Sequence, residues 1–135
     1  MTISIDTIRI FVHVLAASVW VGGQIVLAGL VPTLRRIGDD APKQAAQAFN
    51  RVAWPAFGIA VATGVWSLNA VSIEDTSSGY QVALLVKLAL VAASGVGAYL
   101  HTTATTKSAL AIWGAVGAVG ALAAMFYGAV LATNA

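Results

Sequence analysis

The sequence predicts an all-α, integral membrane four-helix transmembrane bundle with both termini outside (N-out/C-out). First, 59% of the 135 residues are hydrophobic and only 9% are charged, whereas a soluble domain carries about 25% charged residues. Second, the chain contains four mostly apolar runs of the length needed to cross the hydrocarbon core of a bilayer. Third, the basic residues flank these runs. We therefore expect a single four-helix transmembrane domain, residues 1–135.

The first helix is expected at residues 5–36. Its apolar centre, residues 10–30, is too long for a signal-peptide core and ends at no convincing cleavage site, so it should remain in the mature protein. Pro32 predicts a bend near its end. At about 100° per residue, one narrow stripe of this helix carries four polar groups and an indole. Because lipid would not accept such a line, the stripe should face protein. Its members are Asp6, Arg9, His13, Trp20 and Gln24.

The second helix is expected at residues 41–71, with Asp39 or Asp40 as its N-cap and Pro42 in its first turn. A kink is expected at Pro55. Helical spacing predicts that one narrow face of mostly small side chains points inward. This face comprises Arg51, Pro55, Gly58, Ala62 and Asn69.

The third and fourth helices are expected at residues 80–103 and 108–133. The fourth contains a ladder of small residues, Gly120, Ala124 and Gly128, which allows helix backbones to approach closely. Packing inside the bundle is the preferred interpretation of this ladder, and a homodimer through the fourth helix is the alternative. We find no convincing sequence repeat between the two halves of the chain.

The loops predict the orientation of the helices. Basic residues lie between the first and second helices and between the third and fourth, whereas the loop at residues 72–79 contains Glu74 and Asp75 and no basic residue. By the positive-inside rule the two basic connections are cytoplasmic, which places the acidic loop and both termini outside. The same rule explains the net charge of +2 and the pI near 9.3, so no nucleic-acid partner is expected.

Ionisable residues at membrane depth are costly, and each indicates a functional site. His13 and Lys87 each lie about two turns inside the outer ends of their helices, at similar depth, and Arg9 lies one turn above His13. His101 is fourteen residues beyond Lys87, about 21 Å along a helix. His101 should therefore lie at the cytoplasmic edge, and it should not share one haem with His13.

Structural roles are the alternatives for several of these residues. Lys87 would snorkel outward from its helix end, and His101 would be a solvated or packing histidine. Only for His13 is a functional role preferred, because an inward imidazole needs a partner or a ligand.

The residue types also restrict the metal chemistry. Cu(I) prefers thiolate and thioether ligands, but the chain has no Cys, and Met125 is its only methionine beyond Met1. One imidazole in an apolar pocket fits haem ligation better than a path for copper. The sequence contains no hydrolytic triad, carboxylate pair or phosphate-binding loop.

Several short motifs resemble the CopD-like superfamily of small integral membrane proteins. On the first helix they are His13 followed by Trp20-Val21-Gly22-Gly23, then Pro32 with Arg35-Arg36; the others are Thr63-Gly64, and Lys87-Leu88 with His101. The resemblance implies a four-helix unit in the bacterial cytoplasmic (inner) membrane. One branch contains the copper-resistance CopD membrane domain and implies copper movement. The HemJ-like branch implies haem b, with His13 and Lys87 important for function.

From the residues and the resemblance together, we expect a CopD-like protein that binds haem b or a copper ion near the outer leaflet, in metal or haem handling or electron transfer. His13 would be the metal ligand, with His101 less favoured, and the cofactor would also contact Lys87, Arg9, Trp20 and Gln24. A HemJ-like protoporphyrinogen oxidase is one alternative. A cofactor-free accessory subunit of a larger membrane complex is another. Whether the protein is an enzyme is left open.

Overall fold

The computed structural model describes residues 1–135 as α-helices joined by short connections, with no β-strand. The helices are α1 (Ile5–Ile37), α2 (Ala41–Ala70), α3 (Ser78–Thr103) and α4 (Lys107–Thr133), and a single 3₁₀ turn, η1 (Ile73–Asp75), precedes α3. Each helix ends within two residues of the expected position. All four are long and apolar enough to cross a membrane. The expected all-α class is confirmed, and the chain is a multi-pass membrane protein.

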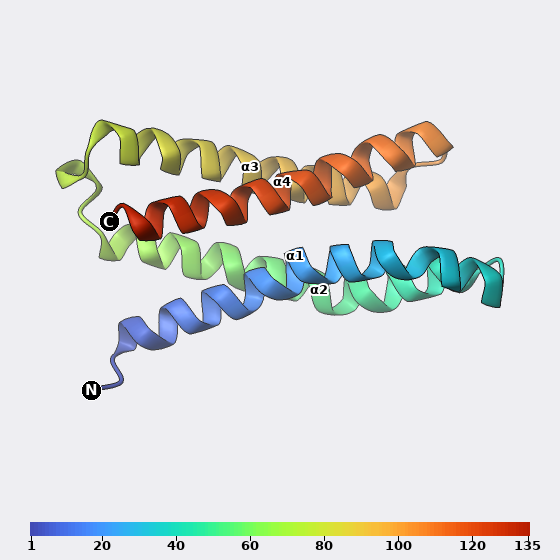
Figure 1. The fold of residues 1–135 in the computed structure, drawn as a ribbon, viewed down its shortest axis with the longest axis horizontal. Coiled ribbons are helices and arrows are strands. Elements are labelled where there is room, and N and C mark those ends of the chain that lie inside the picture. The colour runs from blue at the N-terminus through green and yellow to red at the C-terminus, as the bar shows by residue number, and fades with distance from the viewer. The chain divides into compact units, whose positions relative to one another are not determined.

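The chain divides into two compact units, Met1–Val71 and Ser72–Ala135. Each unit is a hairpin of two long antiparallel helices, α1 with α2 and α3 with α4 (Figure 1). The short connections within each hairpin leave the two helices no alternative to packing side by side.

Local sequence signals account for the helix ends. Ser4 caps α1 in a reciprocal capping box with Thr7, which satisfies backbone N–H groups that have no partner within the helix. The side chains of Ser77 and Thr106 cap α3 and α4 in the same way, without the reciprocal bond. Asp40 occupies the N-cap position of α2 without a side-chain hydrogen bond, and a proline follows in the first turn.

Burial in both hairpins is the reverse of that in a soluble protein. The buried apolar residues are mostly alanines, whereas many Ile, Leu, Val and Phe side chains are exposed. Lipid is as apolar as leucine, so membrane helices associate through small residues that let their backbones come close. The large side chains lie outside the contact between the two helices of each hairpin.

The α3–α4 hairpin shows this close packing most clearly. A Cβ built on Gly97 would lie 2.6 Å from the backbone nitrogen of Gly117, and one on Gly120 would lie 3.2 Å from the backbone of Ser94. Ser94 is fully buried, and its hydroxyl donates to the Gly117 carbonyl at 2.8 Å. Ala124 is buried as well. The ladder of small residues therefore packs inside this hairpin, and a homodimer through α4 stays a prediction.

Candidate functional site

Three of the five residues in the predicted polar stripe of α1 lie toward α2. Arg9 and Trp20 are buried, and half-buried His13 is hydrogen-bonded to Thr63 of α2. Gln24 differs, because its side-chain amide donates to the Trp20 carbonyl of its own helix at 3.0 Å. Asp6 has an exposed side chain at the start of the stripe. The two hairpin helices thus enclose a guanidinium, an imidazole and an indole in a row.

The orientation of the His13 ring is determined by Thr63. His13 Nδ1 lies 2.8 Å from Thr63 Oγ1, and that hydroxyl lies 2.7 Å from the Ile59 carbonyl and 3.1 Å from the Ala60 carbonyl. A helical threonine characteristically donates its one proton to such a carbonyl. The hydroxyl oxygen then accepts from Nδ1–H, which leaves the lone pair of the imidazole on Nε2. This tautomer is the one suited to ligation through Nε2.

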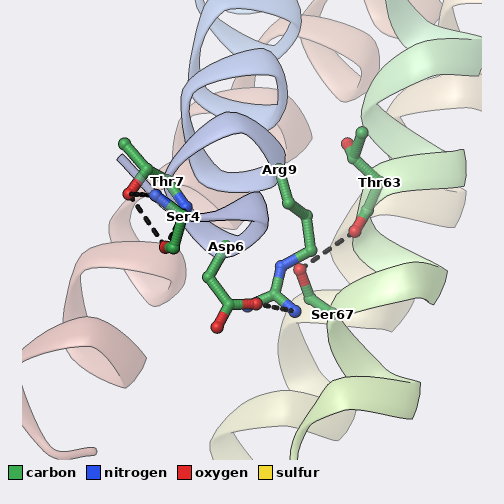
Figure 2. Close-up of polar contacts among 6 residues, drawn as sticks. All are labelled: Ser4, Asp6, Thr7, Arg9, Thr63 and Ser67. Atoms are coloured by element: carbon green, nitrogen blue, oxygen red, sulfur yellow. Dashed lines mark hydrogen bonds and ion pairs between the residues drawn. The ribbon is translucent and has the colours of Figure 1, made fainter. Parts of the chain in front are cut away.

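Arg9 lies one helical turn from His13, at the entrance to the hairpin. Figure 2 shows its side chain extending from α1 toward α2, where Thr63 and Ser67 lie. Its only ion pair joins Nη1 to Asp6 Oδ1 at 3.2 Å, and the Asp6 side chain is 64% exposed. Arg9 Nε is buried without any acceptor, and buried Nη1 is within ion-pair distance of Asp6 but makes no hydrogen bond of acceptable geometry.

An aromatic cluster lies on the other side of His13. The Trp20 ring packs against Trp54 and Phe57 of α2, with ring centroids 5.1 Å and 4.5 Å away. Farther along the same interface, a Cβ on Gly23 would overlap the ring of Phe49. The contact between α1 and α2 is therefore aromatic on this side of the polar groups.

The face predicted for the second helix does not pack against α1. All five of its residues are exposed, and a Cβ on Gly58 would meet nothing within 4 Å. The buried residues of α2 are instead Ala53, Ala56 and Thr63. Both stripes consist largely of small residues, so helical periodicity alone could not distinguish them. The hydrogen bond of Thr63 with His13 and the packing of Trp54 and Phe57 on Trp20 select the face of α2 that packs.

Sequence reasoning missed Thr63 and Ser67 as candidate site residues. Both lie on α2 near Arg9 (Figure 2), and Ser67 donates to the Thr63 carbonyl at 2.9 Å. The available signal was a pair of hydroxyl residues four positions apart on an otherwise apolar helix. That spacing places both on one face.

Lys87 and His101 belong to the other hairpin, where each lies over a glycine of α4. The Lys87 amine is 3.4 Å from a Cβ built on Gly128, and the His101 ring is 3.0 Å from one built on Gly114. His101 Nδ1 donates to the Leu110 carbonyl at 2.8 Å. The exposed His101 is therefore held by a hydrogen bond at the end of α3.

The contacts between helices occur at the same sequence spacing in both hairpins. Seven residues separate His13 from Trp20 on α1, and seven separate Lys87 from Ser94 on α3. In each helix the first residue lies beside a glycine of the partner helix and the second is buried. Three residues further on, Gly23 and Gly97 each closely approach the partner helix. Lys87 is thus the positional counterpart of His13, a correspondence that the residue types conceal.

No family model, curated protein or solved structure matches this chain. The residues therefore carry the functional argument. In the α1–α2 hairpin they combine an oriented imidazole, a buried cation and an aromatic wall, which suits an acidic, largely apolar ligand that has a metal centre.

Proposed function

We propose that this protein is a CopD-like, multi-pass protein of the bacterial cytoplasmic membrane that binds haem b near the outer leaflet and acts in haem handling or electron transfer. His13 would hold the haem iron through its imidazole. The observation that carries this proposal is the 2.8 Å hydrogen bond between His13 Nδ1 and Thr63 Oγ1. Histidines that bind metals through one nitrogen almost always donate the other N–H to an oxygen, which fixes the tautomer and the ring orientation.

Haem suits the available ligands better than copper does. A haem iron brings four pyrrole nitrogens with it, so one protein imidazole is sufficient. A copper ion would need several protein ligands, preferably sulfur for Cu(I). The chain has no cysteine and no cluster of three or more His, Cys, Asp or Glu side chains.

Different residues of the chain have different roles at this site. Thr63 holds the imidazole in the ligating tautomer, and Trp20 with its aromatic neighbours excludes water from the inner side of the site. When bound, haem supplies an iron that exchanges single electrons, and its potential depends on the axial ligand and on burial. Gln24, which bonds its own helix, is not needed as a ligand.

The test is an absorption spectrum of the protein purified in mild detergent, oxidised and then reduced with dithionite. The wild type should show a Soret band and sharpened α/β bands on reduction, and His13→Ala should lose both. His101→Ala is the matched control because the chain has only these two histidines, and it should keep the spectrum.

Other outcomes would favour the alternatives. A colourless wild type with stoichiometric copper would support copper handling. A colourless, metal-free protein that co-purifies with partner subunits would support the accessory-subunit hypothesis. Turnover of protoporphyrinogen by the purified protein would support the HemJ-like oxidase. A Soret band that persists in His13→Ala would exclude His13 as the ligand.

A further inference from the structure

Arg9 is a buried cation whose hydrogen bonds are incomplete. Its side chain is only 9% exposed; Nε has no acceptor, and Nη1 has an ion-pair partner in Asp6 but no hydrogen bond. An arginine cannot discard its proton in a protein, and a buried charge is costly unless it is paired and hydrogen-bonded. The site therefore lacks an acceptor that would complete it.

Asp6 does not fill this role. Its carboxylate meets only one of the guanidinium nitrogens, at 3.2 Å, and lies mostly in the open. An exposed ion pair of this kind contributes on the order of 0–1 kcal/mol, far less than burying the guanidinium costs. No other carboxylate of the chain forms an ion pair with Arg9.

The location of Arg9 indicates which acceptor would complete its hydrogen bonds. Arg9 is four residues before His13 on the same stripe, a rise of about 6 Å along the helix. The acid groups of a haem lie at one edge of the macrocycle, away from the iron. A histidine and an arginine one helical turn apart would therefore bind different parts of one haem, the iron and an acid group. Arg9 is also one turn from the end of α1, a depth that lipid phosphates reach.

We propose that Arg9 is an oxyanion-binding site that holds a carboxylate or phosphate group through its Nε and Nη1 donors. If the bound group is a carboxylate, Arg9 binds a haem propionate, and the inference rests on the proposed haem function. If the bound group is a phosphate, it belongs to an anionic lipid, and the inference is independent of haem.

The carboxylate arm compares haem b with its dimethyl ester, titrated into cofactor-free protein and followed by the Soret band. A charge-assisted hydrogen bond contributes about 1.5–3 kcal/mol, which corresponds to roughly 10–100-fold in affinity. The wild type should prefer the free acid by that factor, and Arg9→Gln should bind both forms equally. Arg35→Gln is the matched control, because Arg35 is an exposed arginine near the other end of the same helix, and it should keep the preference.

The phosphate arm adds phosphatidylglycerol to neutral detergent micelles and measures the thermal unfolding temperature. Stabilisation that disappears in Arg9→Gln but persists in Arg35→Gln would identify a lipid phosphate as the bound group. Arg9→Lys keeps the charge with fewer donors and should give intermediate results if the variants are folded. The proposal is overturned if neither ester discrimination nor lipid stabilisation depends on Arg9.

The two proposals fail in different ways. If Arg9→Gln still binds the dimethyl ester whereas His13→Ala binds neither form, haem ligation stands whatever Arg9 does. If no variant binds haem but the lipid effect requires Arg9, the oxyanion site stands and the haem function is lost.

Discussion

Replacement of Gly97 by alanine tests whether the α3–α4 hairpin depends on backbone contact. A Cβ at this position would lie 2.6 Å from the backbone nitrogen of Gly117, 2.9 Å from a methyl group of Val116 and 3.1 Å from the Gly117 Cα. The nearest of these atoms is backbone and cannot rotate away. The two helices must therefore separate locally.

The required shift is about 0.8 Å, if the contact is to reach an ordinary van der Waals distance of 3.4 Å. The same shift would lengthen the 2.8 Å bond from Ser94 to the Gly117 carbonyl to about 3.6 Å, beyond hydrogen-bonding range. Overpacking costs about 1–3 kcal/mol and the lost bond about 0.5–1.5 kcal/mol. Alanine recovers up to about 1 kcal/mol of helix propensity. We expect a net destabilisation of about 1–3 kcal/mol.

The assay is unfolding of the purified protein by added SDS, followed by circular dichroism, for Gly97→Ala, Ser94→Ala and the double variant. Because Gly97→Ala already breaks the Ser94 bond, the two effects should be less than additive. Full additivity, or a Gly97→Ala protein as stable as the wild type, would refute the close contact.

Three further predictions follow from the same geometry. Gly23→Ala should destabilise the α1–α2 hairpin by about 1 kcal/mol, the low end of the overpacking range, because its methyl overlaps the outer end of the Phe49 ring, which must move aside; the neighbouring Gly22→Ala has open space and should be neutral in the same assay. Thr63→Val should weaken haem retention about 10–100-fold by removing the hydroxyl that orients the imidazole, and a Thr63→Ser protein with no recovery would count against that role. Since the chain has no cysteine, single variants Asp39→Cys and Glu74→Cys report topology with an impermeant thiol reagent: only Glu74→Cys should react in intact cells, and the reverse pattern would invert the orientation.

Helical periodicity was sufficient to identify which residues of α1 share a face. Arg9, His13 and Trp20 are all directed toward α2, because a line of polar and indole groups is stable only against protein. The same reasoning did not identify the face of α2 that packs against α1, which carries Ala53, Ala56 and Thr63. Small residues occur on more than one side of that helix, and a stripe of small residues does not specify its partner.

The sequence by itself determined the membrane class, the four helices and their ends, because apolar length and capping residues act locally. It also placed a histidine and an arginine within an apolar helix long enough to cross a membrane. Only the tertiary structure decided that Thr63 orients His13, that the hydrogen bonds of buried Arg9 are incomplete, and that the glycines of α4 pack against α3. These facts depend on the register between two helices. That register is set by the fit of side chains from distant parts of the chain, and no single helix contains that information.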